Sequence, residues 1–151
     1  VTLRNARNLV SKHKVKEAIS ILKKSYEENK NRAEVAKYLI KAYMKERSYK
    51  EAALVCKEFL EKNELDSNLM FKASFCLKMN HEFEEAIELA ERIKLREPHN
   101  VRNLIHLADM YAYTKNYARS MKLVKKVFLL EPDNKVAMKI KERIEKEALG
   151  V

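Results

Sequence analysis

Glycine, proline and tryptophan are scarce in this chain. Its 151 residues include one Gly, two Pro and no Trp. Such a shortage of turn-forming residues argues against the tight hairpins of β-proteins, against glycine-rich phosphate loops and against flexible linkers between domains. Leu, Ala, Lys and Glu, which favour helix, are frequent instead. The composition therefore predicts an all-helical chain without a glycine-rich seam between domains.

Long apolar runs and catalytic motifs are also missing. No uncharged apolar stretch approaches the ~20 residues that a membrane-spanning helix needs. The sequence has no nucleophile elbow, no paired-histidine zinc motif and no phosphate-loop pattern. Its four histidines lack the spacing of metal ligands, and they are His13, His81, His99 and His106. We therefore expect no enzymatic activity, no cofactor, no metal site and no membrane span.

What the chain does contain is a period of 34 residues. Small side chains recur at this interval, at Ala18, Ala52, Ala86 and Ser120. Bulky ones recur three residues earlier, at Val15, Tyr49, Phe83 and Tyr117. Large residues of a preceding helix recur at Leu9, Tyr43, Leu77 and Tyr111. A constant interval of this length is typical of stacked helix pairs, in which each pair buries its apolar face against the next.

Only two cysteines are present, Cys56 and Cys76. They form no C-x-x-C pair, and Cys56 corresponds in the period to the apolar residues Leu22, Ala90 and Val124. We therefore expect buried, inert thiols. Free buried thiols suit a reducing compartment, which favours a cytoplasmic location.

These residues resemble the tetratricopeptide repeat, whose units have large and small residues at fixed places in a first helix, an aromatic residue in the turn, alanine in a second helix and a closing proline. Residues 67–100 match this pattern at Met70, Ala73, Ser74, Leu77, Phe83, Ala86, Ala90, Ile93 and Pro98. Residues 101–134 match it at Leu104, Leu107, Ala108, Tyr111, Tyr117, Ser120, Val124, Val127 and Pro132. The pentatricopeptide repeat, which prefers a slightly longer period, is the main alternative.

The two earlier units match less completely. In residues 33–66, Ile40 fills a position that is normally small, and Glu64 replaces the closing proline. In the first unit, Asn5 and Lys30 depart from the pattern. That unit also starts two residues inside the repeat and without methionine, so we expect a segment excised from a longer chain or a truncated first helix.

The resemblance implies an all-α fold, a right-handed superhelical α-solenoid of about four helix-turn-helix repeats plus a C-terminal capping helix. Residues 1–134 would form the four repeats, which are 1–32, 33–66, 67–100 and 101–134. Residues 135–151 would form the capping helix, with an apolar stripe of Val136, Ile140 and Ile144.

Nine helices follow from this layout. They are expected near 2–12, 15–29, 33–46, 49–63, 67–79, 83–96, 101–114, 117–131 and 135–149. Asp66, Asn100 and Asn134 each precede a first helix, where a side-chain oxygen can accept a hydrogen bond from the amides of the first turn. Arg32 breaks this capping pattern.

In a tetratricopeptide array the first helices line a concave groove that binds extended or helical peptides, so the resemblance assigns groove positions to this chain. In residues 33–66 they are Lys37, Lys41 and Lys45. In residues 67–100 they are Asn68, Phe71, Phe75 and Lys78. In residues 101–134 they are Arg102, Ile105, Asp109 and Tyr113.

Chaperone-binding members of the family hold a terminal carboxylate with a clamp of lysines, asparagines and arginine. The corresponding positions here are Lys37, Lys41, Lys72, Arg102 and His106. Lysine stands at both asparagine positions, and His106 stands where arginine is expected. The basic character is kept, but a chaperone tail is only weakly indicated.

Phe71 and Phe75 lie one turn apart, on a helix face distinct from that of Met70, Ala73 and Leu77. They either pack internally and fill the groove, or they form an apolar anchor for a partner. The lysines alone would also suit a solvated helix face. Aromatic side chains with a basic rim together predict a protein–protein interaction scaffold that binds an acidic, amphipathic peptide.

The uneven distribution of charged residues along the chain favours RNA or another anionic polymer as an alternative partner. Residues 1–50 carry 14 Lys and Arg against 5 Asp and Glu, residues 51–100 carry 7 against 11, and residues 101–151 carry 11 against 6. Such basic segments could bind RNA or another anionic polymer. Pairs one turn apart, such as Glu58 and Lys62, indicate solubilising helix faces instead. Self-assembly into a homo-oligomer through the exposed first unit is a third hypothesis.

Overall fold

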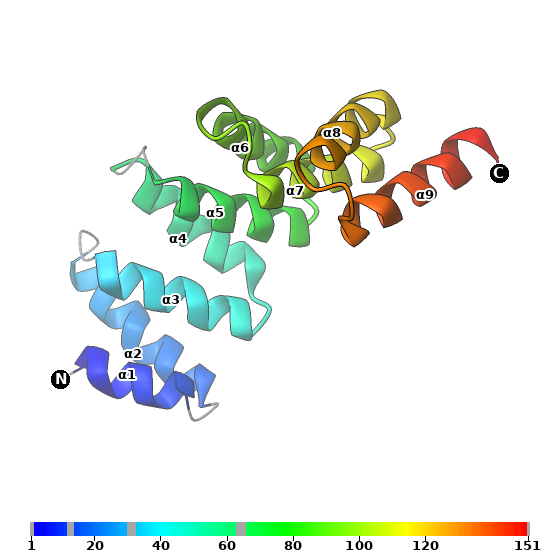
Figure 1. The fold of residues 1–151 in the computed structure, drawn as a ribbon. Coiled ribbons are helices and arrows are strands. Elements are labelled where there is room, and N and C mark those ends of the chain that lie inside the picture. The colour runs from blue at the N-terminus through cyan, green and yellow to red at the C-terminus, as the bar shows by residue number, and fades with distance from the viewer. Residues whose placement is uncertain (1, 12–13, 30–32, 63–65, 151) are drawn as a thin grey trace. The chain divides into compact units, whose positions relative to one another are not determined.

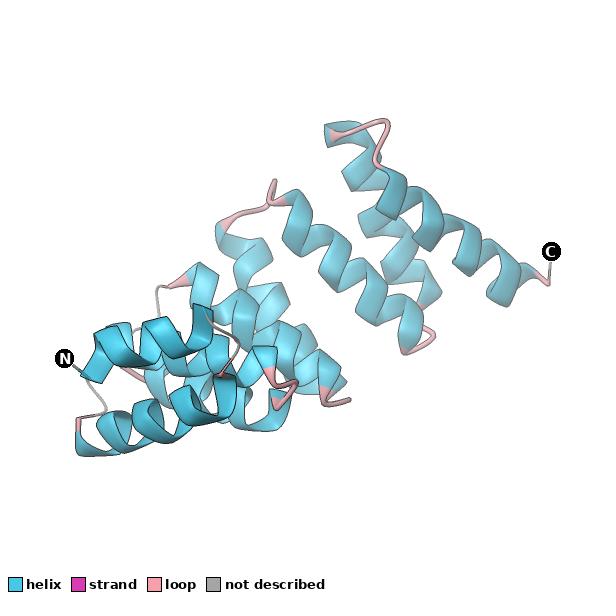
Figure 2. Ribbon diagram, turned by 90° about the horizontal axis from the view of Figure 1, so that it is seen from below, coloured by secondary structure: helices cyan, strands magenta, loops and turns pink. Residues whose placement is uncertain are grey.

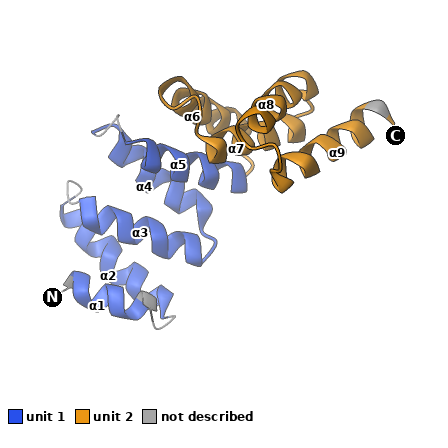
Figure 3. Cartoon of the chain, viewed as in Figure 1, with its two compact units in different colours: residues 1–80 blue, residues 81–151 orange. Residues whose placement is uncertain are grey.

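Figure 1 shows the computed structural model of the chain, which describes residues 2–11, 14–29, 33–62 and 66–150. Within these ranges the backbone forms nine α-helices and no strand (Figure 2). No helix in the described ranges is both long enough and apolar enough to cross a membrane. The chain divides into two compact units, Val1–Asn80 and His81–Val151 (Figure 3).

Each unit is a run of helices packed in chain order. Unit 1 contains α1 (Thr2–Ser11), α2 (Val15–Glu28), α3 (Ala33–Lys45), α4 (Tyr49–Leu60) and α5 (Ser67–Met79). Unit 2 contains α6 (Phe83–Arg96), α7 (Val101–Tyr113), α8 (Tyr117–Leu130) and α9 (Lys135–Leu149). Every helix contacts the next one in its own unit, and α1 also contacts α3, as α9 contacts α7. Local, sequential packing of this kind is the pattern of a helical repeat.

The helices begin at the residues that the periodicity predicts, but one of them ends early. The expected helix at 49–63 stops at Leu60 in α4. The amide of Lys62 donates instead to the carbonyl of Phe59, three residues back, at 3.1 Å, so the chain has already entered a turn. The division into four repeats stays a prediction, and the boundary between the two compact units falls between α5 and α6.

Side-chain caps begin three helices as predicted. Asp66 accepts from the amide of Leu69 at 3.0 Å, and Asn100 accepts from the amide of Asn103 at 3.1 Å. Asn134 accepts from the amide of Ala137 at 2.9 Å. Asn116 caps α8 in the same way. Arg32, the predicted exception, lies outside the described residues.

Three turns that follow first helices share one backbone conformation. Arg47, His81 and Lys115 have φ angles of 58°, 61° and 65°, and they are spaced 34 residues apart. At the first of these turns the amide of Ser48 donates to the carbonyl of Tyr43 at 2.8 Å. A left-handed residue at this place after a helix is usually glycine, because a Cβ atom crowds the following carbonyl oxygen. The three side chains therefore occupy strained positions.

The small residues of the period are all fully buried. Ala18, Ala52, Ala86 and Ser120 have no exposed surface. The hydroxyl of Ser120 donates to the carbonyl of Ala108 in α7 at 2.6 Å, so the polar member of the series has a partner. Asn103 joins α7 to α6 through a 2.9 Å bond from its Nδ2 to the carbonyl of Ala90. Full burial of the small residues agrees with the helix contacts that the sequence predicts at these positions.

The last helix covers α7 and α8 with one apolar stripe. Ala137, Ile140 and Ile144 are buried, whereas Val136 is 52% exposed. The predicted stripe was therefore wrong at Val136. Ala137 lies three residues before Ile140 and seven before Ile144, which is the spacing of a single helix face.

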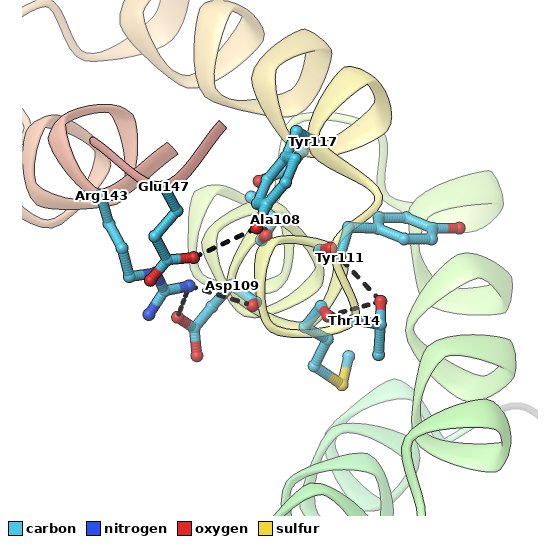
Figure 4. Close-up of polar contacts among 9 residues, drawn as sticks. Ala108, Asp109, Tyr111, Thr114, Tyr117, Arg143 and Glu147 are labelled. Carbon is cyan, nitrogen blue, oxygen red and sulfur yellow. Dashed lines mark hydrogen bonds and ion pairs between the residues drawn. The ribbon is translucent and has the colours of Figure 1, made fainter. Parts of the chain in front are cut away.

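Two polar contacts also hold α9 in unit 2 (Figure 4). Arg143 makes an ion pair with the carboxylate of Asp109 at 3.0 Å and donates to the Asp109 carbonyl at 3.3 Å. The hydroxyl of Tyr117 donates to Glu147 at 3.3 Å. Asp109 and Arg143 are 34 residues apart, so α9 packs on α7 at the place that the period gives to a further first helix.

Replacing Lys115 with glycine should stabilise the protein. Lys115→Gly removes the Cβ atom from a left-handed residue, and we expect the free energy of unfolding to rise by about 0.5 to 1 kcal/mol. Lys115→Ala keeps the Cβ atom and should give no such gain. Urea unfolding followed by circular dichroism measures both variants, and equal stabilities would contradict the assignment of strain to this turn.

Enlarging Ala86 should destabilise the protein. Ala86→Leu overpacks a fully buried position of α6, and we expect a loss of about 1 to 3 kcal/mol in thermal or urea unfolding. Glu88→Leu is the control on the same helix, because Glu88 is exposed and its replacement should change stability by less than about 0.5 kcal/mol. Tolerance of leucine at position 86 would place the 34-residue register in doubt.

Candidate partner-binding site

The lysines predicted on α3 form an exposed row. Lys37, Lys41 and Lys45 are spaced four residues apart and are all exposed, while Leu39 and Tyr43 of the same helix are buried. Across the described ranges, no carboxylate forms an ion pair with any of these three lysines. Three exposed cations on one helix face can act on an acidic ligand.

The phenylalanines predicted on α5 are neither fully buried nor free in solvent. Phe71 and Phe75 are half-buried, as are Lys72 and Lys78, whereas Asn68 is exposed. Because α3 and α5 both pack against α4, the two rows belong to neighbouring parts of unit 1.

One ring contact accounts for part of the burial on α5. The ring of Phe75 packs edge-on against Tyr49 at the start of α4, with centroids 6.1 Å apart and planes at 81°. This contact matches the internal-packing alternative for Phe75 in part. The remaining exposed surface of the ring is available to a ligand.

The predicted positions on α7 differ in their surroundings. Arg102 is exposed and Ile105 is half-buried. The Asp109 carboxylate is occupied by Arg143 of α9. Tyr113 is 58% exposed, and its ring stacks on Phe83 with centroids 4.6 Å apart and planes at 22°.

His81 adds a third ring to the stack of Phe83 and Tyr113. Its centroid lies 5.8 Å from that of Phe83 and 6.4 Å from that of Tyr113. Of these three residues, the sequence predicted only Tyr113 as a groove position. The 34-residue spacing of Arg47, His81 and Lys115 was the signal that could have placed His81 in a turn beside the end of α7.

The carboxylate-clamp positions do not form an exposed set. Lys37 and Lys41 are exposed, Lys72 is half-buried and His106 is only 6% exposed. His106 is buried in the interior of unit 2 and cannot reach a carboxylate bound at the surface. The position that normally carries the clamp's arginine is therefore not accessible to a ligand.

Both cysteines are buried free thiols, as predicted. Burial raises the pKa of the Cys76 thiol to about 11, although the nearby Lys72 opposes that shift. Burial also raises the pKa of Cys56, with a further contribution from Cys76. Thiols that stay protonated at neutral pH are poor nucleophiles. In the described part of the chain, no group of three or more His, Cys, Asp and Glu side chains is placed to hold a metal ion.

A cleft of about 680 Å³ lies on unit 2, among α6, α7 and α8. Tyr111 of α7 donates its hydroxyl to Glu91 of α6 at 2.7 Å, and Lys94 pairs with the same carboxylate at 2.8 Å. The guanidinium of Arg119 in α8 lies over the Tyr111 ring, 5.7 Å from its centroid. Burial alone would raise the pKa of Glu91, but the hydrogen bonds from Lys94 and Tyr111 bring it below its usual value.

Unit 1 contains a smaller cleft of about 220 Å³ among α2, α3 and α4. There the hydroxyl of Tyr26 donates to Glu58 at 3.1 Å, and burial together with this carboxylate raises the pKa of Tyr26 to about 12. The clefts of both units were missed by the sequence analysis. Each needs three helices to meet, and a single-helix pattern does not show such a meeting.

The comparisons with known proteins concern the fold. Neither protein-family models nor curated protein sequences gave a match to this chain. Solved structures do match it. MamA from Desulfovibrio magneticus RS-1, residues 41 to the end, has a TM-score of 0.77 at 16% identity, over 89% of this chain and 76% of the other. A further MamA crystal structure has a TM-score of 0.78 at 17% identity, over 96% and 95%.

A tetratricopeptide repeat protein from Parabacteroides merdae ATCC 43184 is also similar, with a TM-score of 0.85 at 14% identity. The match covers 96% of this chain and 58% of that protein. These neighbours are tetratricopeptide-like helical solenoids. The fold predicted from the sequence is thus confirmed: the chain is an all-α helical repeat of the tetratricopeptide type.

Proposed function

We propose that this chain is a protein-interaction scaffold that binds an acidic, amphipathic peptide on α3 and α5 of unit 1. The observation that carries the proposal is the exposed row of Lys37, Lys41 and Lys45 on α3, together with the half-buried Phe71 and Phe75 on α5. Binding, rather than catalysis, is the role that such a surface supports.

The two rows would contribute in different ways. Half-buried aromatic rings are typical anchors of an interface, because they remove much apolar surface from water and lose little conformational entropy on binding. Exposed lysines contribute mainly to the rate of encounter and to the choice of an acidic ligand. A peptide with apolar side chains on one face and carboxylates on the other matches both rows.

The predicted positions of unit 2 are considered by themselves. Arg102, Ile105 and Tyr113 of α7 offer a cation, an aliphatic side chain and an exposed ring. Asp109 is less suited to contact a partner, since Arg143 already pairs with it. The two buried thiols fit a reducing compartment, and the cytoplasm is the proposed location.

Nucleic acid is less well supported as the partner. Binding of single strands usually combines aligned cations with aromatic rings on which bases stack. The α3 row has cations, but Tyr43 of the same helix is buried, and the edge-on contact with Tyr49 occupies part of Phe75. Self-assembly and binding of RNA stay predictions of the sequence.

Charge reversal on α3 should weaken binding of an acidic peptide. We expect Lys41→Glu to raise the Kd of a fluorescein-labelled glutamate–leucine peptide about tenfold or more, measured by fluorescence anisotropy. Lys24→Glu makes the same charge change at an exposed position of α2, which carries none of the proposed binding residues, and should have a much smaller effect. An equal rise of the Kd in the two variants would mean that net charge, and not the α3 row, determines binding, and this result would contradict the proposal.

Truncation of Phe75 should separate binding from folding. Phe75→Ala should weaken the same peptide about tenfold while costing the free energy of unfolding no more than about 1 kcal/mol, because the ring is only half-buried. A loss of about 3 to 5 kcal/mol would mark a core aromatic residue. In that case Phe75 is structural, and the anchor on α5 does not exist.

A further inference from the structure

The clefts of the two units are built from corresponding positions but have opposite charge. Tyr43 lines the cleft of unit 1, and Tyr111, two repeat periods later, lines the cleft of unit 2. The same shift relates Glu51 to Arg119. It also relates Glu58 to Lys126 and Lys23 to Glu91. The tyrosine is kept while three surrounding charges change sign.

The charges in the unit 2 cleft favour an anionic ligand. Its lining includes one carboxylate, Glu91, and four cations, which are Lys94, Arg119, Lys122 and Lys126. Lys94 pairs with Glu91, and the hydroxyl of Tyr111 donates to the same carboxylate, which leaves Arg119, Lys122 and Lys126 in excess. Among the described residues, neither Lys122 nor Lys126 has an ion-pair partner. A carboxylate entering this cleft therefore meets unpaired cations and little repulsion.

The same cleft has apolar surface that is exposed to solvent. Leu95 is 82% exposed, and the exposed Pro98 and the buried Leu123 also line the cleft. An aliphatic side chain of a ligand would pack on Leu95, and this contact would remove the apolar surface of both side chains from water. The cleft thus combines an apolar contact with a basic rim.

We propose that the cleft of unit 2 is a second peptide-binding site, which takes an acidic segment carrying a bulky aliphatic side chain. It lies among α6, α7 and α8 of unit 2, and it shares no residue with the surface proposed on α3 and α5 of unit 1. The corresponding cleft of unit 1 has three carboxylates against one lysine and would exclude the same segment. The clefts of the two units therefore differ in the ligands that they can bind.

A nucleic acid strand fits this cleft less well than a peptide. Base stacking needs the open face of an aromatic ring. The lining has one aromatic ring, that of Tyr111, which is buried and lies beneath the guanidinium of Arg119. Leu95 offers an aliphatic side chain, which suits leucine better than a base.

Fluorescence anisotropy of the full chain with a fluorescein-labelled glutamate–leucine peptide tests the second site. The chain is used with Lys41→Glu and Phe75→Ala in place, so that the surface on α3 and α5 does not hide the cleft. In this background we expect Arg119→Glu with Lys126→Glu to raise the Kd about tenfold or more. Arg92→Glu with Lys125→Glu is the matched control, because both residues are exposed on α6 and α8 outside the cleft lining.

A second pair of variants tests the apolar contact. Leu95→Ser should weaken the peptide several-fold, whereas Leu129→Ser should not, although Leu129 is 85% exposed and equally apolar. Because both leucines are exposed, replacement by serine should leave the fold intact. Circular dichroism of each variant checks this.

Three results would overturn the second site. One is the absence of binding in the Lys41→Glu, Phe75→Ala background. Another is an equal loss from the cleft variants and their matched controls. The third is that a labelled oligouridylate binds more tightly than the peptide, and that Arg119→Glu with Lys126→Glu removes this binding. If the background instead binds as well as the unchanged chain, the site on α3 and α5 is the one that fails.

Discussion

Close approach of helices at small side chains is the constraint on which this structure depends. Ala18, Ala52, Ala86 and Ser120 recur at one interval and are fully buried. A larger side chain at any of them would force its helix away from its neighbours, because packed interiors have no spare volume. Regular close contacts fix which face of each helix is buried. The remaining faces are free to carry charge and aromatic side chains, and the proposed binding surfaces lie there.

The periodicity predicted most of the fold because helix pairing is local. Every helix start and the caps at Asp66, Asn100 and Asn134 follow from side-chain size and capping chemistry within one repeat. The stripe of α9 was wrong at Val136 because hydrophobicity favoured valine over the smaller Ala137, whose position on the helix decides burial. Features that join several helices were missed, among them both clefts and the pairing of Asp109 with Arg143.

Charge distinguishes surfaces that share one architecture. The exposed lysines of α3 and the cations of the unit 2 cleft both favour acidic ligands, while the corresponding cleft of unit 1 carries three glutamates. A repeat fold allows this variety, because a change of exposed charge leaves the buried contacts between helices unaltered. Surfaces with different preferences can therefore coexist on one chain, which is what a scaffold requires.

We propose that α3 and α5 together bind an acidic, amphipathic peptide. Intermolecular nuclear Overhauser effects between isotope-labelled protein and an unlabelled glutamate–leucine peptide test it most directly. We expect contacts from leucine methyl groups of the peptide to the ring protons of Phe71 and Phe75, with glutamates of the peptide near Lys37 and Lys41. A bound peptide that shows no contact with either phenylalanine would contradict it.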